Sequence, residues 1–388
     1  MSNIVLNGIT WGHSRGITPL QAASQRYSEL HPHVTIHWKK RTLQEFADYP
    51  LEKLVNDYDL LIIDHPWVGC AAATGCVLPL DEYVSAEYMT NQLVNSVGYS
   101  HPSYHYDGHQ WAFAIDAATP AASYRFDLFQ RHQAAVPQNW QQLIALAKQG
   151  RVAIPAIQID VLMNFYMFCI AHGETPFKSE QEVVSAENGI KALQTMHELY
   201  SCIDKKFFHC NPIQVAELMT STDDYWYCPF AYCYSNYARD GYAAKTLTYA
   251  NLVLFGDKRL RSTIGGTGLS VSAATKHKKE AVDFAAWVCS PEVQAGLYVQ
   301  HGGQPGHGAA WTDRMANMIT HNFFHTVRPV MENGYVRPRY NGYLHFQDHA
   351  GHPIQQYLLN PRNPGAVLKE INSIYQQSRV GQKMSMIS

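Results

Sequence analysis

The first 65 residues alternate between short apolar runs and amphipathic stretches, and this alternation constrains the fold more than any other feature of the sequence. Apolar residues at 4–6 and alternating apolar residues at 34–38 are typical of strands, while apolar residues between 20 and 30 recur at helical spacing. Leu60–Ile63 is a continuous apolar run, as expected of a strand buried on both faces. This order of strands and helices predicts a parallel, doubly wound α/β sheet.

Capping signals place the start of the first helix at Thr18. Thr18 can cap the helix, Pro19 suits its first turn, and Gln21 occupies the capping-box position. Residues 11–16, Trp-Gly-His-Ser-Arg-Gly, are then expected to form the loop between the first strand and this helix. A second helix, interrupted near Pro50, is expected before the third strand.

The rest of the chain continues to mix strands and helices. Strands are expected at 111–115, 122–125, 152–159 and 269–272, and helices at 140–148, 163–170, 186–200, 279–289, 291–301 and 366–377. At 388 residues the chain exceeds the usual size of a single core, so two domains are expected. No repeat or low-complexity linker separates them, which predicts several chain crossings between the domains.

Charge and hydropathy exclude several classes of partner. Thirty basic and 32 acidic residues leave a net charge of −2, which gives no electrostatic case for nucleic acid or an anionic membrane surface. No apolar run approaches the ~20 residues that span a bilayer. The N-terminal residues lack the basic region and apolar core of a secretory signal, so we expect either a cytosolic protein or a mature or mis-started form.

The cysteines and histidines form no recognisable metal or catalytic motif. The eight cysteines include no C-x-x-C pair, so free and mostly buried thiols are expected, with one or two disulfides as the alternative in an exported protein. His101, His105 and His109 are four residues apart, but Pro102 and Gly108 would break a helix there. Neither H-E-x-x-H nor G-x-S-x-G occurs. We therefore predict no metal, no cofactor and no catalytic residue.

Four stretches of the sequence resemble one family, and they occur in the family's order. They are IIDHPWVG (62–69), WAFAIDAATPAASYRFDLF (111–129), DDYWYCPFAYCYSN (223–236) and GGTGLSVSAATKHKKEAVDFAAWVCSPEVQAGLYVQHGGQPGHGAAW (265–311). The last contains a glycine-rich turn, an A-x-x-F-x-x-W helix, a Ser-Pro-Glu helix break and a Gly-Gly-x-Pro turn. Together they resemble the family 1 extracellular solute-binding proteins, the sugar-type receptors of ABC importers that include maltose-binding proteins.

The resemblance implies an α/β, two-lobed periplasmic-binding-protein-like fold (type II) with the ligand cleft between the lobes. The first lobe would comprise residues 1–114 plus 260–308, and the second lobe residues 115–259 plus 309–388. Hinge bending would close the lobes on the ligand.

Candidate binding residues follow the predicted strands, because open α/β sheets bind ligands at the carboxyl ends of their strands. The alternatives are an ordinary loop after the first strand, an Asx turn with a core tryptophan after the third, and a simple tight turn at the glycines. The candidates after the strands are Trp11, His13, Arg15, Asp64, His65, Trp67, Asp116 and Asp160, and those implied near the glycine-rich segments are Gly265, Gly266, Thr267 and Gln304.

The segment 223–242 is unusually rich in aromatic residues and occupies the position of a ligand-facing segment in the resembled family. An extended conformation is expected for residues 230–234. The rings predicted to line the cleft are Trp226, Tyr227, Tyr232 and Tyr234, while Phe230 and Tyr242 are predicted to pack.

These observations predict a solute-binding protein that captures a small polar solute, a carbohydrate or a similar ring-containing compound, for ABC-type import. An ABC permease would be the partner if the protein is exported to the periplasm, and we expect a monomer. The alternative is a cytosolic protein that reuses the fold as an enzyme or a small-molecule sensor, in which Asp64 and His65 would do acid–base work.

Overall fold

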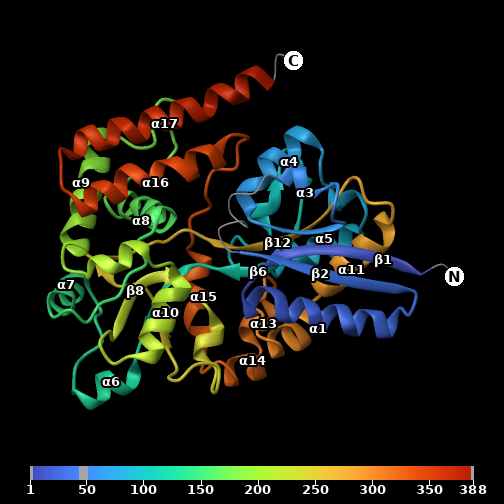
Figure 1. Cartoon of the computed structure of the whole chain (residues 1–388), viewed down its shortest axis with the longest axis horizontal. Helices are drawn as coiled ribbons and strands as arrows, with labels where there is room; N and C mark the ends of the chain where they lie inside the picture. The colour runs from blue at the N-terminus through green and yellow to red at the C-terminus, as the bar shows by residue number, and fades with distance from the viewer. Residues whose placement is uncertain (1–2, 43–50, 386–388) are drawn as a thin grey trace.

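The computed structural model describes residues 3–42 and 51–385. Figure 1 shows two α/β lobes side by side along the long axis, each built around its own sheet. The predicted two-lobed fold class is therefore confirmed. Of the second predicted helix, the described part is the short α3 (Leu51–Leu54), and residues 43–50 lie outside the described residues.

The first lobe contains a five-stranded sheet in the order β2-β1-β3-β12-β6. Its strands are β1 (Ile4–Trp11), β2 (Val34–Arg41), β3 (Leu60–Ile63), β6 (Phe113–Ala118) and β12 (Gly265–Val271). β1 runs parallel to β2 and β3, but β12 pairs antiparallel with both β3 and β6. The parallel pairing predicted for the first three strands is confirmed, whereas β12 enters this sheet on its return from the second lobe and runs the opposite way.

Helices and short elements surround this sheet. They are α1 (Ser14–Leu30), η1 (His65–Trp67), α4 (Val68–Thr74), η2 (Leu80–Glu82), α5 (Ala86–Val94), η3 (Pro102–Tyr104), β4 (His105–Tyr106), β5 (His109–Gln110), α11 (Lys278–Val288), α12 (Pro291–Val293) and the π-helical turn η6 (Gln294–Tyr298). Ser290 caps α12 and Pro291 opens it, as the sequence predicts.

The second lobe contains a three-stranded sheet in the order β8-β7-β9. Its strands are β7 (Pro120–Tyr124), β8 (Tyr227–Tyr232) and β9 (Thr248–Ala250). The strand predicted at 152–159 was wrong: in this segment only Val152 forms a bridge, with Tyr227, and a helix already begins at Gln158. A β-branched apolar run does not distinguish a strand from the entry to a buried helix.

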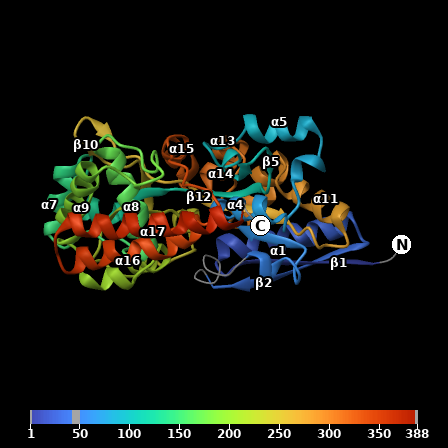
Figure 2. The same ribbon diagram turned by 90° about the horizontal axis from the view of Figure 1, so that it is seen from above.

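Most of the remaining elements belong to or flank the second lobe. They are α6 (Phe126–Arg131), α7 (Trp140–Lys148), α8 (Gln158–Ala171), α9 (Ala186–Tyr200), η4 (Lys205–His209), α10 (Pro212–Ser221), η5 (Ser235–Ala238), β10 (Leu254–Phe255), β11 (Lys258–Arg259), α13 (Ala309–Thr312), α14 (Arg314–Met318), α15 (Phe323–Glu332), α16 (Tyr343–Leu359) and α17 (Pro364–Ser385). α7 and α9 have the predicted bounds, and Figure 2 shows α16 and α17 lying side by side.

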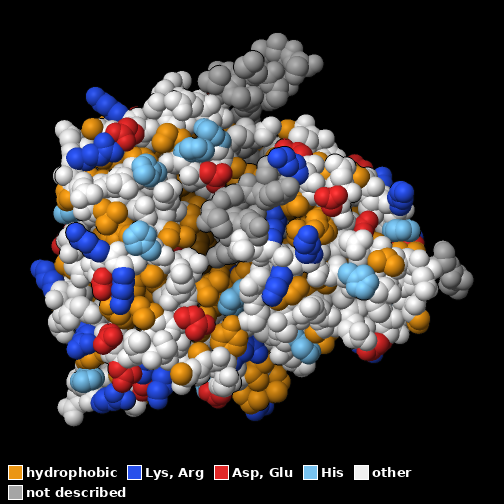
Figure 3. All heavy atoms as spheres, in the orientation of Figure 1, with side chains coloured by type: hydrophobic (Ala, Val, Ile, Leu, Met, Phe, Trp, Pro, Cys, Tyr) orange, Lys and Arg blue, Asp and Glu red, His pale blue; other side chains and the backbone are white. Residues whose placement is uncertain are grey.

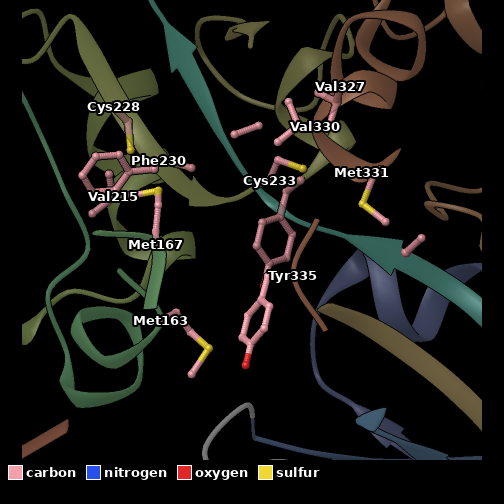
Figure 4. Close-up of a cluster of buried hydrophobic side chains, with 14 of the residues drawn as sticks. Met163, Met167, Val215, Cys228, Phe230, Cys233, Val327, Val330, Met331 and Tyr335 are labelled. Atoms are coloured by element: carbon pink, nitrogen blue, oxygen red, sulfur yellow. The ribbon is translucent and has the colours of Figure 1, made fainter. Parts of the chain in front are cut away.

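α8 is the central helix of the second lobe and is buried over most of its length. A helix that is apolar around its whole circumference belongs in a core rather than at the surface. Figure 4 shows part of the surrounding cluster, in which Met167 of α8 lies near Phe230 of β8 and Val215 of α10. The first turn of this rigid helix carries Asp160.

The chain passes between the lobes at neighbouring segments. Thr119, between β6 and β7, bonds through Oγ1 to Ser262 Oγ at 2.8 Å and to the Thr263 carbonyl at 3.0 Å. The segment 335–342 runs against the first lobe, where Arg339 Nη1 donates to the carbonyls of Pro102, Ser103 and His105. These bonds join the lobes by ordered backbone. The exact residue bounds predicted for the lobes stay a prediction.

Candidate functional site

The segment predicted as a loop at residues 11–16 is shorter: Trp11 ends β1, Gly12 and His13 form the turn, and α1 already begins at Ser14. His13 is the N-cap residue, and its Nδ1 accepts a hydrogen bond from the Arg15 backbone N–H at 3.0 Å. The prediction of a start at Thr18 was wrong because a histidine nitrogen here does the capping usually done by a Ser, Thr, Asp or Asn oxygen. Pro19 therefore lies inside the helix.

Arg15, from this first turn, forms a buried ion pair with Asp116 at the end of β6. Their side chains are 4% and 2% exposed, Arg15 Nε donates to Asp116 Oδ2 at 2.8 Å, and Nη2 donates to the other carboxylate oxygen. Nη1 donates to the carbonyl of Cys233, which follows β8 of the second lobe, at 2.9 Å. Burial alone would lower the pKa of Arg15, but the Asp116 charge outweighs it and raises the pKa. Both predicted residues therefore lie between the lobes, paired with each other.

A second ion pair lies at the end of β3. Arg337 Nη2 donates to both oxygens of Asp64 at 2.7 Å, and its Nη1 donates to Gln347 Oε1 at 2.7 Å. Burial alone would raise the pKa of Asp64, but Arg337 and the His65 hydrogen bond hold it well below its usual value. Arg337 was not predicted, because the surrounding Val-Arg-Pro-Arg-Tyr carries no sequence signal for a strand end or a motif.

His65, next to Asp64, is 1% exposed and its Nε2 has no hydrogen-bond partner. Its Nδ1 lies 3.2 Å from Asp64 Oδ1. Burial and the Arg337 charge lower the pKa of His65 to about 4, so the ring is neutral at pH 7. Arg337 Nη2 also lies 3.4 Å from Nδ1, so Nδ1 is contacted by both members of the ion pair while Nε2 is left without a partner.

Asp160 is the one predicted carboxyl without a charged partner. Asp160 is 5% exposed, and its Oδ2 has no hydrogen-bond partner. Burial raises the pKa of this carboxyl to about 8. The pKa of Tyr232 is raised, mainly by burial. The charges of Asp64 and Asp160 add to this increase, while the Arg337 charge opposes it. The Tyr232 hydroxyl lies 2.9 Å from Thr263 Oγ1.

Tyr234 lies beside the Arg15–Asp116 ion pair. Its ring lies 4.7 Å from the Arg15 guanidinium carbon and 4.7 Å from the His13 ring centroid. Burial raises the pKa of Tyr234, and the charges of Arg15, Asp116 and Asp160 also act on it. Tyr234 and the Cys233 carbonyl thus join the second lobe to the first ion pair, and the charge of Asp160 acts on both Tyr232 and Tyr234.

Tyr242, predicted to pack, forms a contact that we name the Tyr242 latch, consisting of Tyr242, His13 and Ser14. The Tyr242 hydroxyl lies 2.6 Å from Ser14 Oγ and 3.2 Å from His13 Nε2, which joins the second lobe to the start of α1. Gln304 makes a similar connection: its Oε1 accepts from the Ser235 N–H at 2.9 Å and its Nε2 donates to the Ala117 carbonyl at 2.7 Å.

Several predicted site residues lie in packed surroundings. Trp226 stacks on His132 with 4.5 Å between ring centroids, Tyr227 is 1% exposed within β8, and Trp67 packs into the core of the first lobe. The predicted turn at 265–268 is part of β12. Gly266 has φ +101°, and a Cβ there would lie 2.3 Å from the Asp116 carbonyl, so the glycine lets β12 approach β6 closely. A Cβ on Gly265 would likewise meet the Tyr232 ring, and Thr267 of β12 is buried.

Figure 3 shows a hollow between the two lobes with hydrophobic side chains on its wall. A separate shallow hollow of about 440 Å³, lined by residues of β1, β2 and the loop before β3, lies away from the strand ends that carry the ion pairs.

The described residues contain no group of three or more His, Cys, Asp or Glu side chains that could hold a metal ion. All eight cysteines are free thiols in this structure. No helix within the described ranges is long and apolar enough to cross a membrane.

Two α/β lobes, joined by crossing segments and meeting around polar residues at strand ends, define the class of two-lobed solute receptors. The model of the bacterial extracellular solute-binding protein family matches residues 51–307, and the chain belongs to this family. Solved structures of similar fold include maltose-bound MalE3 of T. maritima, with a TM-score of 0.81, 16% identity and coverage of 96% of this chain and 99% of that chain.

Two further structures of similar fold hold smaller solutes. A solute-binding protein of Agrobacterium radiobacter K84 in complex with ribitol has a TM-score of 0.82, 18% identity and coverage of 97% and 99% of this and that chain. A solute-binding protein of Thermotoga lettingae bound with α-D-tagatose has a TM-score of 0.81, 15% identity and coverage of 97% and 100%.

Buried histidines predict a loss of stability in acid. Burial lowers the pKa of both His65 and His101 to about 4, whereas an unfolded histidine titrates near pH 6.5. Between these values the unfolded chain binds more protons, so stability is lost as the pH falls. We expect each histidine to cost roughly 2 kcal/mol between pH 7 and pH 5. Urea unfolding of wild type and His101→Gln at pH 7 and pH 5 measures this change in the free energy of unfolding.

The matched control is His349→Gln, which changes an exposed histidine of α16. This variant should keep the wild-type pH dependence, while His101→Gln should have a shallower one. Equal pH dependences for wild type and His101→Gln would show that His101 is not held neutral by the fold.

Proposed function

We propose that this protein binds a carbohydrate or polyol between its lobes and presents it to an ABC-type permease on the outer side of the membrane, in the periplasm. The observation that carries the proposal is the polar site itself: residues from the strand ends of the first lobe meet Asp160, Tyr232 and Tyr234 of the second. Family membership and the similarity to receptors holding maltose, ribitol and tagatose support it.

The two ion pairs would fix the frame of the site rather than contact the solute with their full charge. Arg15 and Arg337 are each matched by a carboxylate, so their charges are compensated before any solute enters. Buried polar atoms without partners remain at Asp160 Oδ2, His65 Nε2 and Arg337 Nε. Unpaired polar atoms of this kind suit a ring or chain of hydroxyl groups, because each hydroxyl can both donate and accept a hydrogen bond.

The lobes would close around the solute. We propose that the first lobe comprises residues 1–114 plus 260–308 and the second residues 115–259 plus 309–388, with β6 (Phe113–Ala118) of the first sheet crossing the boundary at residue 115. Motion between them would occur at the crossing segments, and the Tyr242 latch would hold the closed arrangement. We propose a monomer without catalytic residues or nucleic-acid contacts, since each lobe contributes to one binding site and the family consists of solute-binding proteins.

A thermal-shift screen against sugars and polyols tests the proposal. A solute at 100 times its Kd should stabilise the folded protein by about 2.7 kcal/mol. Maltose, ribitol and tagatose are the first probes, followed by other mono- and disaccharides, with isothermal titration calorimetry on any that raise the Tm. Failure of every sugar and polyol to raise the Tm would overturn the proposal.

The Tyr242 latch predicts a measurable change in lobe closure. Tyr242→Phe removes the hydroxyl that bonds Ser14 and His13, and such a hydrogen bond contributes about 1 kcal/mol. The closed population should fall roughly fivefold relative to the open one. Small-angle scattering should show a larger radius of gyration than for Tyr99→Phe, a control at an exposed tyrosine. Identical scattering of both variants would mean that the latch does not hold the lobes.

A further inference from the structure

The carboxyl of Asp160 is buried at the proposed site without a compensating charge. It lies in the first turn of α8, it is 5% exposed, and its Oδ2 has no partner. Within the described residues no arginine, lysine or histidine forms an ion pair with it. The titratable groups whose charges couple to it are Tyr200 of α9, Cys228 of β8, and Tyr232 and Tyr234 at the end of β8, and none of these is a cation at pH 7.

The two arginines of the site do not provide a cation for Asp160, because each is already paired. Arg15 is held by Asp116 and the Cys233 carbonyl, and Arg337 is held by Asp64 and Gln347. The proposed site therefore contains two guanidinium groups and three carboxyl groups. His65 does not add a positive charge, because burial lowers its pKa to about 4.

An unpartnered buried carboxyl is costly to the folded protein and calls for a partner that arrives with the solute. A hydroxyl can hydrogen-bond to the carboxyl, which burial keeps mostly protonated at pH 7. An ammonium group allows the carboxyl to ionise, because it balances the negative charge and donates charge-assisted hydrogen bonds, which are roughly twice as strong as neutral ones.

We propose that the solute carries a protonated amine that binds Asp160, which makes the ligand class an amino sugar or an amino polyol. This inference rests on the proposed function of the site and names its solute class more closely. Asp160 would be the specificity-determining residue, with the hydroxyl groups of the solute held by the other polar atoms of the site.

Matched pairs of compounds test the inference by isothermal titration calorimetry. The pairs are glucose and glucosamine, galactose and galactosamine, and sorbitol and 1-amino-1-deoxysorbitol, with the N-acetylated amino sugars as neutral analogues. For at least one pair, wild type should bind the amine at least tenfold more tightly than its hydroxyl or acetylated counterpart. Asp160→Asn should bind that amine at least tenfold more weakly, while Asp224→Asn, a change at an exposed aspartate of the same lobe, should bind it as wild type does.

Proton release gives an independent readout. A carboxyl with its pKa raised to about 8 is mostly protonated at pH 7 and must ionise to bind an ammonium. Titrations of 1-amino-1-deoxysorbitol in two buffers of different ionisation enthalpy should therefore show roughly one proton released per molecule bound to wild type, and none for Asp160→Asn.

The outcomes separate this inference from the proposed function. Binding of a hydroxyl or acetylated compound as tightly as the amine would overturn the amine while leaving a sugar or polyol receptor. An amine preference that persists in Asp160→Asn would overturn the role of Asp160. Failure of all of these compounds to bind would overturn the inference, whereas the proposed function would be overturned only if the wider sugar and polyol screen also failed.

Discussion

Replacing Arg15 by alanine is expected to lower the free energy of unfolding by about 3–5 kcal/mol, because the change leaves the Asp116 carboxylate buried and unpaired. The variant also loses the hydrogen bond from Arg15 to the Cys233 carbonyl, which ties the two lobes together. Urea unfolding at pH 7.5, followed by circular dichroism, measures the effect.

Arg328→Ala is the matched control, because Arg328 pairs with Glu332 on an exposed helical surface where such pairs contribute at most about 1 kcal/mol. Should Arg15→Ala fail to fold, Arg15→Lys offers a milder test, since lysine keeps the charge but not the two-pronged geometry. Equal losses for Arg15→Ala and Arg328→Ala would show that the buried pair has no special role in stability.

Replacing Asp160 by asparagine is expected to stabilise the unliganded protein by about 5 kcal/mol at pH 8. The raised pKa of about 8 means that the folded protein holds a proton on Asp160 that the unfolded chain releases near pH 4. Stability is therefore lost as the pH rises from about 4 to 8, and the asparagine variant escapes this loss. Urea unfolding of wild type and Asp160→Asn at pH 5.5 and pH 8 measures the gain, which should be larger at pH 8.

Asp224→Asn again serves as the control and should change stability by less than about 0.5 kcal/mol at both pH values. A variant Asp160→Asn that is no more stable than wild type at pH 8 would show that Asp160 has a compensating partner. Such an increase in the free energy of unfolding would mean that Asp160 destabilises the fold and is retained for binding.

The fold was predictable where the sequence pattern is long and local. α7 and α9 have the predicted bounds because amphipathic spacing over several turns depends little on the rest of the molecule. The start of α1 was not predictable, because His13 is not a usual capping residue and Thr18 with Pro19 is a stronger local signal. The direction of β12 depends on where the chain returns from the second lobe, which no local pattern records.

The sequence allowed us to predict which residues lie near the candidate site, but not which of them contact one another. Strand ends pointed to Arg15, Asp64 and Asp116, and the structure brings these residues between the lobes. Sequence did not reveal that Arg15 and Asp116 bind each other, since they are far apart in the chain, nor that Arg337 pairs with Asp64. An aromatic residue alone does not indicate its direction, so Trp226 was grouped with Tyr234 although it stacks on His132.

The position of β12 in the first sheet has a consequence for synthesis on the ribosome. β3 and β6 are not neighbours, because β12 lies between them and is hydrogen-bonded to both. β6 ends at Ala118 but β12 begins only at Gly265, so at 5–20 residues per second the nascent chain waits roughly 10–30 s for its missing strand. During that time the apolar edge of β3 is open to pairing with other chains. Holdase chaperones on the emerging polypeptide would protect this edge until translation passes Val271.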